Sequence, residues 1–405
     1  MKIVEGKYGS AIIHADIFDD TTKNQVEALV NQKFTKDLKI RIMPDCHAGA
    51  GCVIGTTMTI KDKVVPNLVG VDIGCGMLCV KLGNINIDLV KLDEFIHENI
   101  PAGQKANSYI IETKVKIEDF KCYNMLKKIN YLKKSVGSLG GGNHFIEIDI
   151  ADDGTKYLVI HTGSRNLGKQ VAEIYQNIAI KYHEDMIFNK EEAIKKTIES
   201  YKKKGKEKEI QARIKEISGM KLELDMPKDL CYLEGKYFKN YMHDMHLSQE
   251  YAKANRYEIA RRILEYLNLD LKKLFHFETV HNYINMKDKI LRKGAISAYK
   301  GEMVLIPINM RDGCIIAKGK SNKEYNYSAP HGAGRIMSRN KAFKEITLEE
   351  YKKSMEGIYS TTVNKDTIDE APMAYKPIES IIKNICDTVD ILEIIKPIYS
   401  FKAAE

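Results

Sequence analysis

The chain has 405 residues, of which 63 are basic and 55 acidic, giving a formal net charge of +8. Its 44% of hydrophobic and 29% of charged residues exclude a wholly disordered chain, and no apolar run is long enough to cross a bilayer. The positive charge is compatible with a polyanionic substrate but does not by itself predict one.

Eight cysteines are scattered along the chain, at positions 46, 52, 75, 79, 122, 231, 314 and 386. They form no CxxC pair, and the first residues are not an apolar signal segment. Reduced thiols are therefore expected instead of a disulfide framework. We expect a soluble, cytoplasmic protein.

In chain order, the first half alternates short apolar runs with glycine-rich turns. Runs of β-forming residues predict strands at 51–60, 77–82, 145–148 and 156–160. A helix is predicted at 168–182, where Val171, Ile174, Tyr175 and Ile178 share one face. Several polar motifs follow directly on these strands, where binding residues commonly lie.

Residues 183–226 differ in character, because lysine and glutamate dominate them. This pattern favours a solvated helical hairpin inserted in the fold. The alternative is a basic arm that contacts a polynucleotide backbone. We prefer the inserted hairpin.

The second half begins with a long helix predicted at 237–268 and returns to strands at 303–306 and 314–317. Neither an internal repeat nor a low-complexity linker divides the chain. We therefore expect an α+β fold in which helices surround one mixed sheet core, with residues 1–405 forming a single domain.

The most informative motif is the turn at residues 70–77 (GVDIGCGM), which places Asp72 and Cys75 close together. Alone, this pair is also compatible with a buried structural cysteine beside a capping aspartate. Histidines in similar glycine-rich or polar settings favour a metal site over a structural role for this pair, because carboxylate, thiolate and imidazole are ligands for Mn, Fe or Zn. The candidate histidines are His144, His161 and His281.

Phosphate-binding groups accompany these histidines. Asn143 precedes His144, Arg165 follows His161 by one turn, and Asn282 follows His281. Amide and guanidinium groups suit phosphate oxygens. Glu147, on the strand after His144, could accept hydrogen bonds from the edge of a base.

His331 lies in a different setting, between a proline and a glycine in residues 328–335 (SAPHGAGR). Such a histidine could be a metal ligand, a general acid or base, or a nucleophile on phosphorus. The chain has no GxxxxGK[ST] loop and no Lys-x-Asp-Gly motif. If a covalent nucleotide adduct forms, histidine is therefore a better candidate than lysine.

Taken together, eight motifs give the chain a resemblance to the RtcB family of GTP-dependent tRNA-splicing RNA ligases. They occur in the order of that family at residues 43–47 (MPDCH), 70–76 (GVDIGCG), 140–145 (GGGNHF), 161–165 (HTGSR), 281–283 (HNY), 292–295 (RKGA), 331–335 (HGAGR) and 369–376 (DEAPMAYK). As a set they are specific, although each alone would be weak.

The resemblance implies an α+β fold with a deep metal cleft that binds two Mn²⁺ ions. Cys75 would bridge the ions, with His144 on one and Asp72, His161 and His281 on the other. His331 would attack the α-phosphate of GTP and form a histidine–GMP adduct. The GMP then passes to an RNA 3′-phosphate, and a 5′-hydroxyl displaces it to join the strands. A 2′,3′-cyclic phosphate is opened first by metal-activated water.

The resemblance also implies the nucleotide contacts. Asn143, Asn282, Arg165, Lys293 and Arg335 would bind phosphates, and Glu147, Tyr375 and Lys402 would contact guanine. Many members carry Pro-Gly-Ser-Met-Gly where this chain has residues 307–311 (PINMR). Asn309 would take the place of the serine that contacts the nucleotide in those enzymes.

Two other functions compete with RNA joining. A metal-dependent phosphoesterase acting on RNA ends would share the metal ligands but would not need His331 as a nucleophile. A nucleic-acid-binding protein with a structural metal would need no nucleophile at all. The ligase is preferred, because a protein that only binds nucleic acid would not need so many candidate ligands flanked by glycine.

Overall fold

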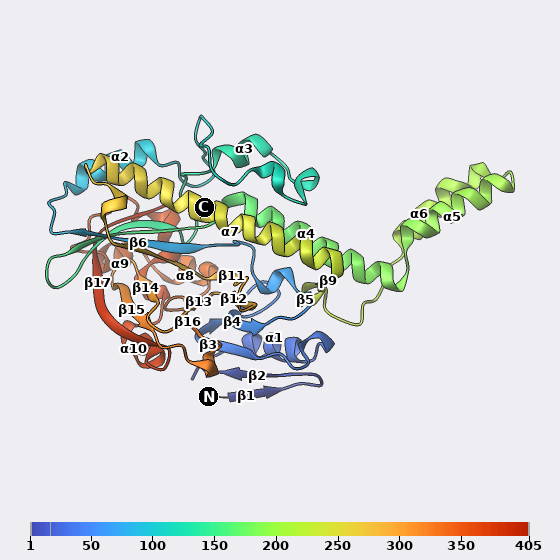
Figure 1. Ribbon diagram of the computed structural model, residues 1–405, viewed down its shortest axis with the longest axis horizontal. Helices are drawn as coiled ribbons and strands as arrows, with labels where there is room; N and C mark the ends of the chain where they lie inside the picture. Colours follow the sequence, from blue (N-terminus) through green and yellow to red (C-terminus); the bar gives the residue numbers. More distant parts are fainter. Residues whose placement is uncertain (1, 17, 404–405) are drawn as a thin grey trace.

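The computed structural model describes residues 2–16 and 18–403. Two large β-sheets form its centre, and helices cover their outer faces (Figure 1). This mixed α+β architecture confirms the predicted fold class. Within the described part of the chain, no helix is both long and apolar enough to span a membrane.

The larger sheet has seven strands, and every neighbouring pair is antiparallel. In spatial order they are β10 (His276–Val280), β6 (Gly76–Gly83), β8 (Lys156–Thr162), β7 (Phe145–Ile150), β17 (Val389–Lys402), β15 (Gly313–Gly319) and β14 (Met303–Asn309).

Both faces of this sheet are buried, and side chains alternate between them with the period of two that a strand imposes. On β6, Leu78 and Val80 pack against Ile259 and Ile263 of helix α7 (Gly235–Tyr266). Cys79 belongs to a separate apolar cluster on the opposite face. The predicted strands at 77–82, 145–148, 156–160, 303–306 and 314–317 are thus all confirmed as parts of this sheet.

The seven-stranded sheet curls until its two edge strands meet. β10 and β14 are in contact, and the backbone N–H of Leu305 donates to Oγ1 of Thr279 at 3.1 Å. The inward-facing side chains therefore fill a barrel-like interior. We call this space the barrel interior; its apolar lining includes Met77, Val159 and Ile395.

The second sheet has six strands in the order β1 (Lys2–Glu5), β2 (Ser10–Ile13), β3 (Ile40–His47), β4 (Ile54–Thr59), β12 (Ile290–Lys293) and β11 (Asn282–Ile284). Only β2 and β3 are parallel among these described pairs. Two short ribbons complete the strands: β13 (Ala295–Ser297) with β16 (Ser328–Pro330), and β5 (Lys63–Val64) with β9 (Leu233–Glu234).

Helix α7 is the longest helix and lies beside α4 (Arg165–Ile187), as Figure 1 shows. Both agree with the helices predicted at 168–182 and 237–268. The remaining α-helices are α1 (Asp20–Val30), α2 (Leu89–Asn99), α3 (Ile129–Lys134), α5 (Lys190–Lys203), α6 (Ile210–Gly219), α8 (Arg339–Glu345), α9 (Leu348–Ser354) and α10 (Ile378–Ile385).

Helices α5 and α6 pack against each other and project away from the sheets at the far end of α4 (Figure 1). Every residue of α5 is at least partly exposed. This hairpin lies within residues 183–226, although α4 itself continues to Ile187. The hairpin therefore stands apart from the elements that form the site described next.

Candidate functional site

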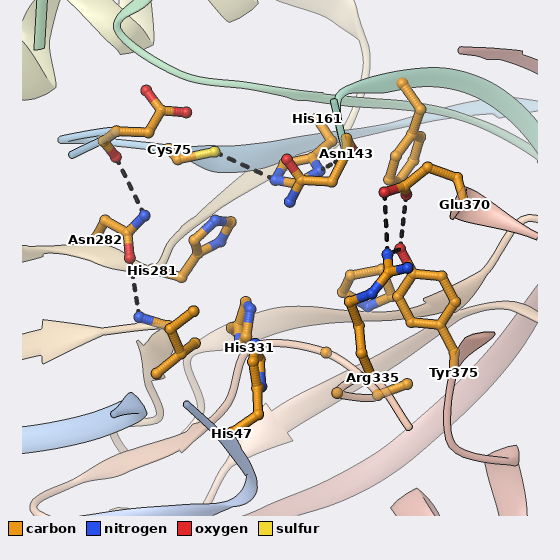
Figure 2. A pocket seen from close by; sticks show the side chains of 18 of the residues that line it. His47, Cys75, Asn143, His161, His281, Asn282, His331, Arg335, Glu370 and Tyr375 are labelled. Carbon is orange, nitrogen blue, oxygen red and sulfur yellow. Dashed lines mark hydrogen bonds and ion pairs between the residues drawn. The ribbon is translucent and has the colours of Figure 1, made fainter. Parts of the chain in front are cut away.

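A cavity of about 400 Å³ opens between the two sheets. Its wall comes from the glycine-lined turn before β6, from β7, β8, β11 and β12, and from the loop after β16 (Figure 2). Most of the residues predicted for the site line this cavity: Asp72, Cys75, Asn143, Glu147, His161, His281, Asn282, Lys293, Asn309, His331, Arg335, Tyr375 and Lys402.

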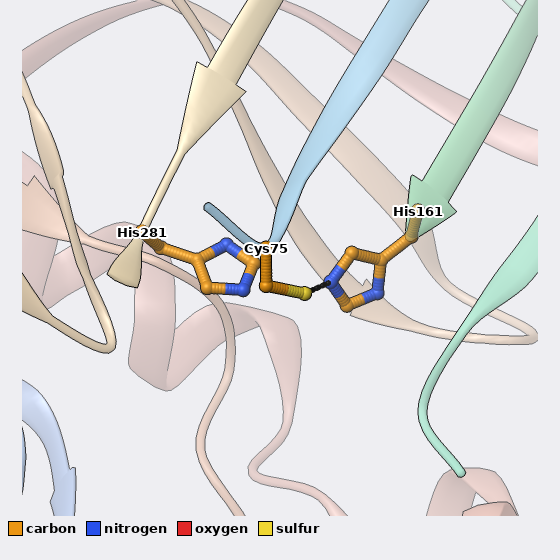
Figure 3. A group of neighbouring side chains, drawn as sticks. All are labelled: Cys75, His161 and His281. Carbon is orange, nitrogen blue, oxygen red and sulfur yellow. Dashed lines mark hydrogen bonds between the residues drawn. The ribbon is translucent and has the colours of Figure 1, made fainter. Parts of the chain in front are cut away.

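Cys75 lies at the centre of the metal-ligand candidates. Its Sγ is 3.3 Å from Nε2 of His161 and 3.5 Å from Nε2 of His144. Figure 3 shows that His281 approaches the same sulfur from the other side. The predicted convergence of one thiol and three imidazoles, from segments far apart in the sequence, is thus present in the structure.

The backbone fixes which ring nitrogen faces the sulfur. Nδ1 of His144 lies 3.0 Å from the carbonyl oxygen of Leu139, and Nδ1 of His161 lies 3.0 Å from that of Asn143. A carbonyl only accepts, so Nδ1 of each histidine donates to it. Nε2 of His161 then presents a lone pair toward Cys75, whereas Nε2 of His144 faces both Cys75 and the carboxylate of Asp72. Such backbone partners are typical of histidines that bind metals.

The ligand atoms are grouped differently from the division between two ions that the resemblance implies. Asp72 was expected beside His161 and His281, but its Oδ2 lies 3.1 Å from Nε2 of His144. The ligand atoms form two groups that share Cys75: one with Asp72 and His144, the other with His161 and His281. The physical reason is the turn itself, which directs Asp72 back toward the strand end that carries His144.

A glycine allows this placement of Asp72. A Cβ atom at Gly163 would lie 2.3 Å from Oδ1 of Asp72, which is closer than any side chain could be tolerated. The backbone N–H of Ser164 then donates to the same oxygen at 3.2 Å. The glycine after His161 is therefore needed for close approach, as its motif suggested.

Burial sets the protonation of the ligand groups. It lowers the pKa of His161 and of His281 well below the ordinary value, and neighbouring histidines lower the pKa of both further. Burial also raises the pKa of the Cys75 thiol, with the charge of Asp72 adding to this. Both imidazoles are thus neutral and able to bind a cation, whereas the thiol needs a metal to become a thiolate.

Arg256 of α7 fixes the backbone next to Cys75 and His161. The sequence pattern did not predict this role. Its Nη1 donates to the carbonyl oxygens of Gly74 at 2.8 Å and of Thr162 at 2.7 Å. These residues adjoin Cys75 and His161. Its Nε and Nη2 bind Glu278 of β10, and the arginine side chain is only 1% exposed.

Replacing Arg256 with methionine is expected to lower the free energy of unfolding by about 3 kcal/mol, because Glu278 and two carbonyls lose a buried partner. Urea denaturation measures this change. Arg261→Met is the control on the same helix: the arginine is 50% exposed, so a loss below about 1 kcal/mol is expected. Equal losses in the two variants would contradict the bracing role.

His331 faces the metal-ligand candidates from the opposite side of the cavity. Its ring centroid lies 5.0 Å from that of His281. Its Nδ1 is 2.7 Å from Oδ2 of Asp45, a carboxylate that is 1% exposed and also accepts the backbone N–H of His331 at 3.1 Å. With Nδ1 donating to this carboxylate, Nε2 keeps its lone pair and is the ring nitrogen available to a ligand or substrate.

The other end of the cavity is organised by Glu370, another residue that the sequence analysis did not single out. Its carboxylate accepts from the Tyr375 hydroxyl at 2.6 Å and from Arg335 at 3.2 Å (Figure 2). It also pairs with Lys402 at 2.6 Å. Glu147 lies nearby; burial raises its pKa to about 7, although Lys402 opposes this.

Two predicted phosphate or nucleotide contacts are placed differently from expectation. The guanidinium of Arg165 donates to the carbonyl of Gly103 at 2.7 Å and to Ser138 at 3.1 Å, so the structure turns it away from the cavity wall. Asn309 lines the cavity, but its amide binds Asp312 and accepts backbone N–H groups of its own turn. Both amide ends of Asn309 are thus engaged locally.

Lys293 is buried beneath the cavity, and its Nζ donates to two backbone carbonyls, those of Ala50 at 2.7 Å and Asn67 at 3.0 Å. Burial lowers the pKa of this lysine. His47 also lines the cavity, and burial lowers its pKa, with the nearby His331 adding to the effect. Its motif at 43–47 was noted in the sequence, without a role for the histidine.

The fold and the site define a protein in which buried side chains that could hold a metal lie beside His331 in one cavity. The family described as tRNA-splicing ligase RtcB matches residues 25–131 and 123–403. The chain therefore belongs to the RtcB family.

Individual relatives agree with this assignment. The RNA-splicing ligase RtcB of Escherichia coli strain K12 is 27% identical over 403 residues, covering 90% of each chain. The tRNA-splicing ligase RtcB of Methanococcus maripaludis is 27% identical over 433 residues, covering 85% of this chain and 83% of the relative. That of Aeropyrum pernix is 25% identical over 434 residues, covering 84% and 82%.

Proposed function

We propose that this member of the RtcB family is an RNA ligase that joins 3′-phosphate or 2′,3′-cyclic phosphate ends to 5′-hydroxyl ends, using GTP and Mn²⁺. The observation that carries the proposal is the shared cavity: His331, with a free Nε2, faces the metal-ligand groups around Cys75. A nucleophile for phosphorus and groups that neutralise phosphate charge thus meet at one place.

The side chains around Cys75 fit two divalent transition-metal ions. Cys75, His161 and His281 would hold one ion, and Asp72, Cys75 and His144 the other. Thiolate, imidazole and carboxylate ligands suit Mn²⁺ and its neighbours rather than Mg²⁺ or Ca²⁺. When bound, such ions neutralise charge on phosphate oxygens and lower the pKa of water.

GTP is the source of the GMP group that becomes bonded to His331. Nε2 bonds to the α-phosphorus while the bond from this phosphorus to the bridging oxygen breaks, and pyrophosphate leaves with the electron pair. The ring is cationic after this step, since Nδ1 keeps its proton. The negative charge of Asp45 stabilises that cation at 2.7 Å.

Transfer to RNA follows from the chemistry of this adduct. An oxygen of the RNA 3′-phosphate bonds to the same phosphorus and breaks its bond to Nε2. A 5′-hydroxyl then attacks the RNA phosphorus, GMP leaves, and the hydroxyl proton is lost. A 2′,3′-cyclic phosphate must first take up water to become a 3′-phosphate.

The far end of the cavity supports guanine binding. The carboxylate of Glu147 can accept hydrogen bonds from the N–H groups of guanine. Tyr375 and Lys402, which both contact Glu370, line the same cavity. Arg335, with Asn143, Asn282 and Lys293 on the cavity wall, would bind phosphates. Arg165 and Asn309 would need to release their present partners first.

We also propose that the chain acts as one catalytic domain, with residues 183–226 as an insertion, because cavity residues come from both ends of the sequence, His47 to Lys402. The eight cysteines are all free thiols. A reducing compartment and an RNA substrate together support a cytoplasmic location.

The test is an RNA-joining assay with defined ends. Labelled RNAs ending in 3′-phosphate or 2′,3′-cyclic phosphate are expected to join a 5′-hydroxyl RNA only when both GTP and Mn²⁺ are present. A 3′-hydroxyl donor and a 5′-phosphate acceptor are the matched controls and should stay unjoined. Removal of the end phosphate without joining would instead identify a phosphoesterase, and binding without change a nucleic-acid-binding protein.

A further inference from the structure

The barrel interior contains a second group of metal-binding side chains, behind the cavity. Glu147 and Asp149 are two positions apart on β7, so both face inward. Cys314 reaches the same space from β15, which is separated from β7 only by β17. The surrounding side chains, such as Met77, Val159 and Ile395, are apolar.

Asp149 is the unusual member of this group. It is 0% exposed, and its carboxylate oxygens accept no hydrogen bond from a nitrogen or oxygen atom of the described residues; the Cys314 thiol is its polar neighbour. An isolated buried carboxylate costs several kcal/mol unless a cation or proton compensates it. Glu147 is better satisfied, because Oε1 accepts from the Ser400 hydroxyl at 2.9 Å. Burial raises the pKa of Asp149 well above the ordinary value, so this carboxyl is protonated unless a cation takes the place of the proton.

The spacing of the three groups fits a single ion. One oxygen of Glu147, one oxygen of Asp149 and Sγ of Cys314 all lie within 4.8 Å of one another. Ligands that are each about 2.0–2.3 Å from a tetrahedral zinc ion lie about 3.3–3.8 Å apart, so the three groups would have to close by up to about 1.5 Å. Only small side-chain movements would be needed to close the site.

We propose that Glu147, Asp149 and Cys314 bind one divalent transition-metal ion of the zinc class inside the barrel, at a site separate from the groups around Cys75. Two carboxylates and a thiolate suit Zn²⁺ or Co²⁺ better than Mg²⁺ or Ca²⁺. The fourth position is left for water or for the second oxygen of a carboxylate.

A bound ion would have two effects, one on charge and one on the connection between strands. The ion compensates the charge of Asp149, and it links β7 to β15 across β17. Burial, with the charge of Asp149, raises the pKa of the Cys314 thiol, so the ion must displace a proton and binding weakens as the pH falls. The proposal does not depend on GTP chemistry, although Glu147 belongs to both sites.

Cobalt absorption tests the thiolate ligand directly. The Cys75→Ser variant removes the thiol of the cavity, so any remaining thiolate-to-cobalt charge-transfer band must come from elsewhere. We expect the band to persist in Cys75→Ser and to disappear in Cys75→Ser/Cys314→Ser. Cys79→Ser in the same background is the matched control: its thiol is 1% exposed and inside the barrel but outside the ligand group, so the band should remain.

Zinc content provides a second readout. Wild type and Asp149→Asn are loaded with Zn²⁺, desalted and analysed by elemental mass spectrometry, with circular dichroism to verify folding. We expect Asp149→Asn to hold one equivalent less per chain. Absence of the cobalt band in Cys75→Ser, or equal zinc content in wild type and Asp149→Asn, would overturn the proposal.

Discussion

Replacing Cys75 with alanine is expected to reduce RNA joining by at least about 10³-fold, because Lewis-acid stabilisation of phosphate charge is worth several kcal/mol and each 1.4 kcal/mol is tenfold in rate. Cys75 Sγ is the atom that both ligand groups share. Its loss should therefore weaken both ions at once, unlike the loss of a histidine that serves one group. Joining rates and bound Mn²⁺ per chain are the measurements.

A second buried cysteine supplies the control for this variant. Cys231 is 0% exposed and lies in the apolar core away from the cavity, so Cys231→Ala tests the loss of a buried thiol alone. It should keep its Mn²⁺ content and its joining rate. If Cys75→Ala bound as much Mn²⁺ as wild type, the shared-ligand arrangement would be wrong.

Changing Asp45 to asparagine is the second large perturbation. The carboxylate accepts from Nδ1 of His331 at 2.7 Å and so keeps Nε2 free for attack. An amide has no charge to stabilise the cationic ring and can present an N–H that favours the wrong tautomer. Formation of the GMP adduct should slow by about 10²- to 10⁴-fold, as expected when a histidine loses its orienting carboxylate.

Single-turnover labelling with GTP measures this step apart from RNA joining. Asp93→Asn is the control, because Asp93 is a 4% exposed carboxylate that accepts hydrogen bonds from Thr361 and Tyr399 away from the cavity. It should label at the wild-type rate. An Asp45→Asn variant that also labelled at the wild-type rate would show that the carboxylate does not set the tautomer of His331.

Local patterns in the sequence were sufficient to predict the main elements. The apolar run before His161 and the apolar face of residues 168–182 correspond to β8 and α4. The closure of the seven-stranded sheet could not be predicted, because it depends on strand order and on the contact of β10 with β14. The strand order, in which only β17 separates β7 from β15, brings Cys314 to Asp149, although 165 positions in sequence separate them (314 − 149).

The site was predictable where glycines flank the functional side chain. Cys75, His144 and His161 lie in such motifs, whereas the signal for His281 was the neighbouring amide of Asn282. The four side chains fall into two groups that share Cys75. Residues that act through another group were missed: Asp45 supports His331, Arg256 braces the turn at Cys75, and Glu370 holds its partners through buried ion pairs. Such roles follow from tertiary contacts. The motifs at 43–47 and 369–376 contain Asp45 and Glu370, and this was the available signal.

In the proposed reaction, His331 becomes the carrier of GMP beside the groups around Cys75. The most direct measurement is incubation of the wild-type protein with α-labelled GTP and Mn²⁺, followed by denaturation and peptide mapping by mass spectrometry. An acid-labile GMP adduct is expected on the peptide containing His331 and should be absent from His331→Ala. A protein that remains unlabelled, or that carries the label on another residue, would contradict it.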